Sequence, residues 1–453
     1  MATTRKLAIS TDSMPLQQAD PEIYEILQEE RERQRDSIDL IASENMVSTA
    51  VLEALGSVFT NKYSEGYPGR RYYGGCDVVD KLERLCISRA LRAFNLNPDE
   101  WGVNVQPLSG SPANLEVYMG LLQPHDKIMG LRLASRGHLT HGFYVGQKKI
   151  SATAVFYTSL QYDVNKETGL LDYDDMERLA KAYCPKLIIA GASCYSRYWD
   201  YKRCREIADK VGAYLMADIA HIAGLIAGEA HPSPFEYCHV VTTTTHKTLK
   251  GPRAGMIFFN KKIDPTIEDK INNAVFPTVQ GGPHNNAIAS LAVQLKTVMS
   301  PEWKVYAKNI VENARRLAIE CESRGFLVVT GGTDNHTVVI NLKPFGVNGN
   351  KAEHICNAIN VTVSKSTVPG DVSAMNPSGL RLGTAMIVAR GAVPEDMAFI
   401  AEALLEAVKI TQSIQESHGE NHEDFKRGAE GNERIAALRK KVVDWIRQFP
   451  IIS

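Results

Sequence analysis

Short unbroken apolar runs recur along the chain, each separated from the next by a stretch of helical pattern. The clearest are KLIIAG (186–191), AYLMAD (213–218), HVVTTTT (239–245) and MIFF (256–259). Strands that are apolar on both faces are buried on both faces, and their alternation with helices is typical of a mostly parallel sheet. The pattern therefore predicts an α/β fold with a mostly parallel sheet covered by helices.

This pattern changes near residue 300. A long helix is predicted from about Glu302 to Arg324, and three strand-like segments follow it, namely FLVVTGG, HTVVINL and INVTVS. Amphipathic helices are predicted over 394–417 and 432–448. The change indicates a large domain at 45–300 followed by a smaller C-terminal α+β domain at 301–453.

An N-terminal arm is expected at residues 1–44. The segment at 21–35 has the pattern of a charged helix with Ile23, Ile26 and Leu27 on one side. A helix this polar does not fold alone, so we expect it to lie on another surface.

Charge and cysteine content narrow the classes of partner. The 453 residues include 51 basic and 52 acidic ones, so no global field attracts nucleic acid or an acidic membrane surface. The eight cysteines contain no C-x-x-C pair, which argues against a disulfide framework or a zinc site. No apolar run is long enough for a membrane span. We expect small-molecule partners or other copies of the chain, no metal, and a cytoplasmic location, with an organelle as the alternative.

Lys247 is a candidate for Schiff-base chemistry. It follows a β-branched run and His246, at a position where an open α/β sheet presents its functional groups. A neutral lysine amine can attack an aldehyde, as a pyridoxal cofactor requires. An ordinary surface lysine after a strand explains this segment equally well.

Asp218 ends the strand-like run AYLMAD, and His221 follows three residues later. A carboxylate at this depth can pair with a protonated pyridine nitrogen and keep a cofactor ring able to accept electrons. An aspartate that caps the next helix is the alternative. The order of Asp218, His221 and Lys247 on successive strand ends favours the cofactor site, and Ser193 after the preceding strand is a further candidate contact.

A phosphate site is predicted where Ser109, Gly110 and Ser111 precede Pro112. Proline is well suited to a first helical turn, and the start of a helix offers free N–H groups and a favourable dipole to an anion. A simple helix cap explains the serines almost as well.

Two further segments suit an amino-acid substrate. The loop NKYSEGYPGRRYYGG (61–75) holds four tyrosines, four glycines and one carboxylate, which favours substrate orientation and proton transfer over a structural loop. Arg381 lies in SGLRLGT, where its planar guanidinium could hold a carboxylate through two hydrogen bonds. An ordinary surface arginine is the alternative.

Taken together, these motifs closely resemble the serine hydroxymethyltransferase family, within the aspartate-aminotransferase-like, fold type I class of pyridoxal-phosphate enzymes. The resemblance runs from about residue 21 to residue 415. It is carried by LIASEN (40–45), NKYSEGYPGRRYYGG (61–75), SGSPAN (109–114), GHLTHG (137–142), ADIAHIAG (217–224), TTTTHKTLKGPRAG (242–255), QGGPHN (280–285) and SGLRLGT (378–384).

The resemblance implies a role for each matching residue. Lys247 would bind pyridoxal phosphate covalently, while Asp218, His138 and Glu65, with Tyr73, would complete the catalytic set. The implied cofactor contacts are Ser109, Gly110, Ser111, His138, Ser193, Asp218, His221, His246, Gly281 and Gly282. The implied contacts to the amino acid and to tetrahydrofolate are Ser43, Tyr63, Glu65, Tyr73, Leu133, Gly137, Leu139, Ser366 and Arg381.

The same resemblance implies a reaction and an assembly. Serine and tetrahydrofolate would be converted reversibly to glycine and methylenetetrahydrofolate. Glu65, Tyr63, Tyr73, Gly281 and Gly282 would reach the site from a neighbouring subunit, which implies an obligate dimer and a tetramer of two dimers.

Departures from the family pattern fall on the folate side. Arg136 stands where the family has a glycine, and Ser366 replaces an asparagine, whose amide both donates and accepts hydrogen bonds. These changes keep two alternatives open. One is a folate-independent aldolase of 3-hydroxy amino acids such as threonine, and the other is a catalytically weak regulatory paralogue.

Overall fold

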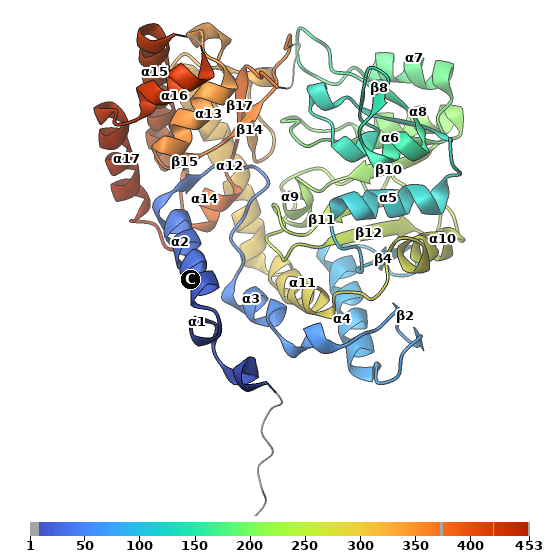
Figure 1. Ribbon diagram of the computed structural model, residues 1–453. Coiled ribbons are helices and arrows are strands. Elements are labelled where there is room, and N and C mark those ends of the chain that lie inside the picture. Colours follow the sequence, from blue (N-terminus) through green and yellow to red (C-terminus); the bar gives the residue numbers. More distant parts are fainter. Residues whose placement is uncertain (1–8, 372–374, 420, 452–453) are drawn as a thin grey trace, which may run out of the picture.

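Seven strands form the central sheet, which fills one half of the molecule (Figure 1). The computed structural model describes residues 9–371, 375–419 and 421–451. Across the sheet the strands follow the order β4 (Trp101–Asn104), β12 (Gly255–Asn260), β11 (Val240–Thr244), β10 (Tyr214–Asp218), β9 (Leu187–Gly191), β5 (Lys127–Leu131) and β8 (Thr158–Tyr162). Only β12 is antiparallel to its neighbours, so the predicted mostly parallel sheet is confirmed.

The four apolar runs that led to this prediction all lie in the sheet, as β9, β10, β11 and β12. Residues of β9 and β11 are buried without exception, because helices cover the sheet. The helices of this half are α3 (Thr49–Leu55), α4 (Asp77–Ala93), α5 (Gly110–Leu121), α6 (Ala152–Phe156), α7 (Tyr173–Tyr183), α8 (Tyr201–Val211), α9 (Ala223–Ala227), α10 (Ile267–Asn273) and α11 (Asn285–Val298).

A second sheet occupies the other half of the molecule. It is antiparallel, in the order β13 (Leu327–Val328), β14 (Thr337–Asn341), β17 (Gly379–Gly383) and β16 (Ser364–Ser366). Its helices are α12 (Pro301–Ser323), α13 (Gly349–Ala358), α14 (Ala385–Ala389), α15 (Met397–His418), α16 (His422–Ala429) and α17 (Glu433–Ile446). Arg381 is the central residue of β17, which confirms that it lies on a strand between glycines.

The N-terminal segment joins the second half. Its helix α2 (Pro21–Asp36) packs beside α17, and Arg447 Nη2 lies 2.7 Å from Asp36 Oδ2. The buried Arg390 guanidinium donates hydrogen bonds to the carbonyl groups of Gln34 and Ile446, which fixes α2 against the C-terminal helix. The strand β1 (Ile38–Asp39) then pairs in parallel with β15 (Val361–Thr362). Ile23 and Ile26 remain at least half exposed.

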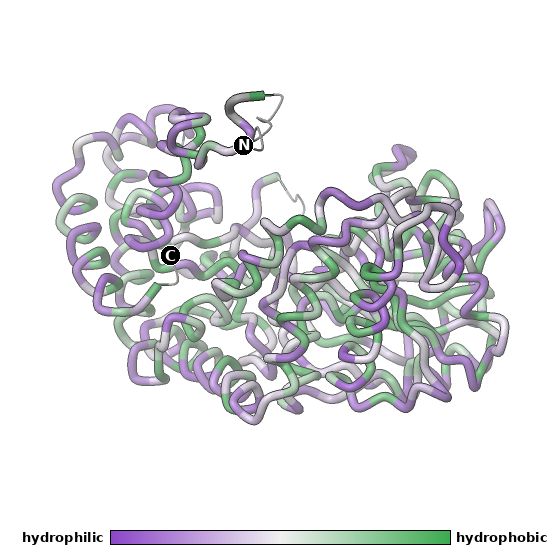
Figure 2. Tube along the Cα trace, turned by 90° about the horizontal axis from the view of Figure 1, so that it is seen from below, coloured by the Kyte–Doolittle hydropathy of each residue, from purple (hydrophilic) through white to green (hydrophobic). Residues whose placement is uncertain are grey.

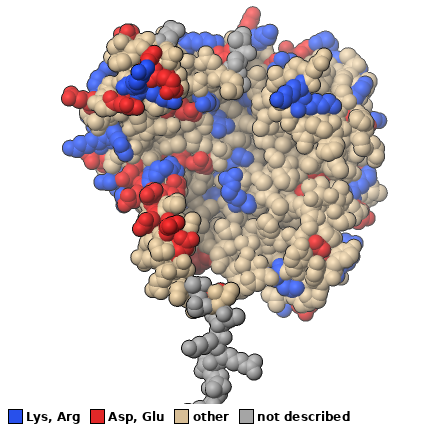
Figure 3. All heavy atoms as spheres, in the orientation of Figure 1, with Lys and Arg blue, Asp and Glu red and all other residues tan. Residues whose placement is uncertain are grey.

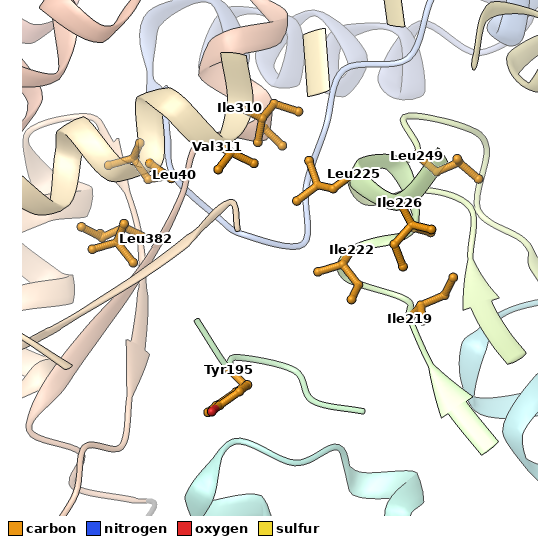
Figure 4. Packing of buried hydrophobic residues seen from close by; sticks show 14 of the residues in the cluster. Leu40, Tyr195, Ile219, Ile222, Leu225, Ile226, Leu249, Ile310, Val311 and Leu382 are labelled. Atoms are coloured by element: carbon orange, nitrogen blue, oxygen red, sulfur yellow. The ribbon is translucent and has the colours of Figure 1, made fainter. Parts of the chain in front are cut away.

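One hydrophobic core extends through both halves. Figure 2 shows hydrophobic segments running through the interior, while the outer helices alternate between hydrophobic and hydrophilic residues. In Figure 4, Leu40 and Leu382 lie on one side of the region between the sheets and Ile219 and Ile222 on the other, and all four belong to the same cluster. The division into domains at residues 45 and 300 stays a prediction.

One face of the molecule carries side chains of both charge signs (Figure 3), as the near-equal numbers of basic and acidic residues predict. Figure 3 shows acidic and basic side chains distributed over the same face, with acidic ones gathered in the region of α2. Within the described ranges, no helix combines the length and the apolar character needed to cross a lipid bilayer.

Candidate active site

A cavity of about 390 Å³ lies at the carboxyl ends of β9, β10 and β11. Strands of a parallel sheet place their carboxyl ends at one edge, so side chains that follow different strands meet there. The lining residues are Ser43, Glu44, Ser109, Gly110, Ser111, Asn114, His138, Ala192, Ser193, Asp218, Ala220, His221, Thr244, His246, Lys247 and Arg253. The cavity therefore brings together half of the residues that the sequence nominated.

Lys247 follows β11 by three residues, and its Nζ donates a hydrogen bond to Thr244 Oγ1 over 3.0 Å. Burial lowers the pKa of Lys247 to about 8, helped by the positive charges of Arg253 and Arg381, while Asp218 opposes the shift. A lower pKa leaves more of the amine neutral at physiological pH. Neutral amine is the form that attacks an aldehyde.

Asp218 is the last residue of β10, and its carboxylate is held from several sides. Oδ2 lies 2.9 Å from His141 Nε2 and accepts a hydrogen bond from Asn114 Nδ2 at 2.9 Å, while Oδ1 accepts from the backbone N–H of Ala220. Burial alone would raise the pKa of Asp218, but His141 and the hydrogen bonds hold it well below its usual range. The group is thus a buried anion able to pair with a protonated ring nitrogen.

His138 and His141 flank this carboxylate on the short helix η4 (Leu139–His141). Burial lowers the pKa of His138 to about 4, so its ring is neutral and can stack against an aromatic ligand. His138 Nδ1 lies 2.6 Å from Thr140 Oγ1, which fixes the ring orientation. One ligand atom each of His138, His141 and Asp218 lies within 4.8 Å of the others. Because the Asp218 carboxylate already has hydrogen-bond partners, we interpret these three residues as a hydrogen-bond network under the cavity and not as a metal site.

The predicted phosphate site is the N-terminus of α5. Ser109 is the N-cap residue, and its hydroxyl makes no capping hydrogen bond, so it is available to a ligand. A Cβ at Gly110 would lie 2.6 Å from Thr244 Cγ2, so only glycine fits this close approach. The free N–H groups and the dipole of α5 favour an anion at this position.

Arg381 of β17 does not line the cavity itself, but it contacts the lining residue Ser193 and has no acidic partner among the described residues. Its Nη1 donates to the Ser193 carbonyl at 3.2 Å and its Nη2 to Ser364 Oγ at 3.4 Å. Its buried Nε has no hydrogen-bond partner within the ranges described. A guanidinium in this state is suited to bind a carboxylate.

His221 and His246 complete the cavity wall. Burial and the nearby Lys247 charge lower the pKa of His246 to about 3 and that of His221 well below its usual value. The buried Nδ1 of His246 has no protein partner in the described part of the chain. Both rings are therefore neutral and can accept or donate one hydrogen bond to a ligand.

Five predicted residues gather elsewhere in the same chain and do not line the cavity. The Tyr63 and Tyr73 ring centroids are 5.0 Å apart, and both rings are about half exposed. A Cβ on Gly281 would lie 3.2 Å from Glu65 Oε1, and one on Gly282 would lie 3.0 Å from the Tyr63 ring. These residues form what we call the tyrosine cluster, namely Tyr63, Glu65, Tyr73, Gly281 and Gly282.

The residues predicted for folate lie where η3 (Leu133–Ser135) meets the segment after β16. Thr367 Oγ1 donates to the Ala134 carbonyl at 3.0 Å, and Ser366 Oγ lies 3.8 Å from Cys194 Sγ. A Cβ at Gly137 would lie 1.9 Å from the Leu131 carbonyl oxygen, so this position requires glycine. Leu139 is about half exposed.

Arg136 sits at this junction as a buried cation. Only 5% of its surface is exposed, and its Nη1 has no hydrogen-bond partner among the residues described. Burial lowers the pKa of its guanidinium. Its backbone has a φ of +80°, a left-handed conformation that a non-glycine residue adopts at a cost.

Sequence reasoning missed several residues that hold the site together. Asn114 bridges Asp218 and Thr140, and Thr242 Oγ1 donates to Asn114 Oδ1 at 2.7 Å. His141 and Asn114 both lie in motifs that the sequence analysis quoted, GHLTHG and SGSPAN. Their polar character inside otherwise buried segments was the available signal.

The residues of the cavity fit pyridoxal phosphate. The uncapped helix start suits its phosphate, the buried Asp218 carboxylate suits its ring nitrogen, and Lys247 suits its aldehyde. His246 Nδ1 in the cavity wall and the nearby Arg381 Nε have no hydrogen-bond partner among the described residues, as expected where a ligand supplies it.

Comparison with known proteins gives one consistent result. The sequence model of the family described as serine hydroxymethyltransferase matches residues 16–404. The chain is 51% identical to cytosolic serine hydroxymethyltransferase of Oryctolagus cuniculus, over 97% of this chain and 94% of that relative. It is 49% identical to serine hydroxymethyltransferase of Plasmodium falciparum, over 96% and 98%. It is also 48% identical to the chloroplastic serine hydroxymethyltransferase 3 of Arabidopsis thaliana, over 98% and 86%.

Proposed function

The chain belongs to the serine hydroxymethyltransferase family, and from this premise we propose how its own residues serve the reaction. The enzyme depends on pyridoxal phosphate and interconverts serine and glycine, with tetrahydrofolate as the one-carbon co-substrate. The observation that carries the residue assignment is that Lys247, Asp218 and the start of α5 face one cavity.

Pyridoxal phosphate, when bound, supplies an aldehyde for the amino group and a ring that accepts electrons from the substrate. Lys247 would hold the cofactor through its amine, which its lowered pKa keeps more in the neutral form. Asp218 keeps the ring nitrogen protonated, because a buried carboxylate stabilises a positive charge beside it. His138 covers the ring face, while Ser109, Gly110 and Ser111 bind the phosphate.

The substrate's carboxylate is assigned to Arg381 and Ser43. Arg381 has no acidic partner among the described residues and contacts the carbonyl of Ser193, and both Ser193 and Ser43 line the cavity of Lys247. A bidentate contact there orients the amino acid, which places its side-chain hydroxyl away from the carboxylate-binding end. Ser193, His221 and His246 are assigned to the polar groups of the cofactor ring.

Glu65 is assigned to the proton at the substrate hydroxyl, with Tyr63 and Tyr73 beside it. The tyrosine cluster does not line the cavity of its own chain, which supports a site completed by a second copy. Between residues 52 and 73 several large apolar side chains are more than one third exposed, namely Leu52, Leu55, Val58, Tyr63, Tyr72 and Tyr73. Such a surface favours self-association. The assembly proposed is a dimer, with two dimers in a tetramer.

Tetrahydrofolate is assigned to the junction of η3 and β16, with Leu133, Gly137, Leu139 and Ser366 as its contacts. A cytoplasmic location is part of the proposal and is supported by relatives named cytosolic, although a relative named chloroplastic is similarly close. The domain limits of 1–44, 45–300 and 301–453 complete the proposal, and the two separate sheets support them.

A direct assay tests these assignments. Purified protein with pyridoxal phosphate should release glycine from serine rapidly only when tetrahydrofolate is added. Cleavage of threonine at the same rate with and without tetrahydrofolate would instead point to an aldolase. Binding of pyridoxal phosphate without turnover of either amino acid would point to the regulatory paralogue.

A further inference from the structure

Two buried histidines behind the active-site cavity each leave one ring nitrogen without a hydrogen-bond partner among the described residues. They are His231, at Nε2, and His336, at Nδ1. Their residues are 6% and 0% exposed. Both line a narrow chamber with about 10 Å³ of free space, which shares Ser193, Asp218 and His221 with the cavity of Lys247.

The protons on these rings follow from their other contacts. His231 Nδ1 lies 3.0 Å from the Pro232 carbonyl oxygen, and His336 Nε2 lies 3.1 Å from the Ala42 carbonyl oxygen. A carbonyl can only accept, so these nitrogens carry the protons. Burial lowers the pKa of His231 to about 4 and that of His336 to about 3, so neither ring is charged near neutral pH. The two partnerless nitrogens are therefore hydrogen-bond acceptors.

The chamber that both histidines line leaves room for a ligand that donates to both nitrogens. A water molecule can donate two hydrogen bonds, which matches the two acceptors. The free space is close to that of one water molecule.

We propose that one buried water molecule occupies this chamber and bridges His231 and His336, and that His336 is a positioning residue for the substrate site through its contact with Ala42. The ring of His336 stacks beside that of His221, with centroids 5.6 Å apart and planes 20° apart. Its Nε2 holds the carbonyl of Ala42, the residue before Ser43. Its own carbonyl accepts a hydrogen bond from Thr384 N at 3.1 Å.

The functional part of this inference rests on the proposed role of Ser43 in binding the substrate carboxylate. His336 fixes the backbone that carries Ser43 through its Nε2, while the water satisfies the opposite nitrogen of the ring. Loss of the Ala42 contact should therefore weaken serine binding more than it slows the bound substrate's reaction.

Two substitutions of His336 distinguish its contact with Ala42 from its contact with the proposed water. His336→Gln places an amide N–H where Nε2 was and removes the acceptor at the Nδ1 position. His336→Asn keeps an acceptor near the Nδ1 position and removes the donor to Ala42. We expect His336→Asn to raise the KM for serine about 10-fold with a smaller change in kcat, and His336→Gln to change the KM less than about threefold. If His336→Gln and His336→Asn changed KM equally and lowered the melting temperature by similar amounts, the role of His336 would be structural only, and the proposed positioning role would be wrong.

A crystal structure of the holoenzyme at high resolution tests the water independently of turnover. One water molecule within about 3 Å of both partnerless nitrogens is expected. His231→Asn retains the donor to Pro232 and removes the acceptor, so the water should lose its density in that variant. A dry chamber in the wild type, or a metal ion identified there by anomalous scattering, would overturn the proposal. An enzyme that lacks serine turnover but contains this water would contradict only the proposed function.

Discussion

His141 Nε2 lies 2.9 Å from Asp218 Oδ2 beneath the cavity that holds Lys247. Only 1% of the His141 side chain is exposed, so this contact has no competition from solvent. A hydrogen bond to a buried charged group contributes more than an ordinary one, about 1.5–3 kcal/mol. The affinity for the cofactor ring should therefore depend on a residue that does not line the cavity.

Replacing His141 by phenylalanine should weaken pyridoxal phosphate binding about tenfold or more, because Asp218 loses a partner that keeps it ionised. Titration of the apoenzyme, followed by visible absorbance, measures this affinity. His239→Phe is the matched control, since His239 is also buried but precedes β11 at the opposite end of the strand. Equal affinities for the two variants would contradict the role of His141.

Covalent capture of pyridoxal phosphate should depend on Lys247 and on pH. With a pKa of about 8 in place of 10.5, the neutral amine at pH 7 is about 300-fold more abundant. The rate of capture should rise from pH 6 to pH 8 and level off above it, because the neutral fraction follows that titration. Mass spectrometry after borohydride reduction should find the added mass on Lys247. Lys250→Ala should retain the added mass and Lys247→Ala should lose it.

A shared active site predicts complementation between two inactive variants. Lys247→Ala and Glu65→Gln should each have little activity alone. When the two are unfolded and refolded together, mixed dimers contain one site with both wild-type residues, so activity should return. If each site used Glu65 and Lys247 of the same chain, the mixture would be as inactive as its parts.

Arg381→Lys should raise the KM for serine about 100-fold, because lysine keeps the charge but cannot form two parallel hydrogen bonds. Binding of pyridoxal phosphate should change little, since the Arg381 guanidinium contacts the Ser193 carbonyl and the Ser364 hydroxyl and does not line the cavity of Lys247. Steady-state kinetics with serine and a cofactor titration measure the two effects. A large loss of cofactor affinity with an unchanged KM would remove Arg381 from carboxylate binding.

Glu116 on α5 should make the protein less stable as pH rises. Both carboxylate oxygens are buried without a partner among the described residues, and burial raises the pKa of Glu116 to about 8 from 4.5. The folded state therefore binds a proton that the unfolded state has released, and stability falls between about pH 4.5 and pH 8.

Glu116→Gln should remove most of this pH dependence and stabilise the protein at pH 8.5 by about 1 kcal/mol or more. Thermal unfolding at pH 5 and pH 8.5 measures the difference. Glu53→Gln, on an exposed position of α3, is the control and should behave like the wild type. A Glu116→Gln variant with the wild-type pH profile would show that the carboxyl finds a partner.

The sequence predicted the central sheet well because β9 to β12 are apolar on both faces, a pattern that only a covered sheet explains. It also placed Asp218 and Lys247 at successive strand ends, and in the structure Asp218 ends β10 while Lys247 follows the adjacent β11. It did not predict how the polar groups pair, because pairing depends on side-chain positions after packing. His141 against Asp218 and His336 against Ala42 join residues that are 77 and 294 positions apart.

The residue after the short strand β1 links two parts of the site through backbone hydrogen bonds. Leu40 N donates to the Thr362 carbonyl at 2.9 Å, and Gly383 N donates to the Leu40 carbonyl at 2.7 Å. The segment that carries Ser43 is thus linked by its backbone to the strand that carries Arg381, while Asn45 Nδ2 of the same segment donates to the Lys247 carbonyl at 3.1 Å. The backbone of Leu40 therefore links the two residues proposed to bind the substrate carboxylate, so the distance between Ser43 and Arg381 should change little if the two halves of the molecule move.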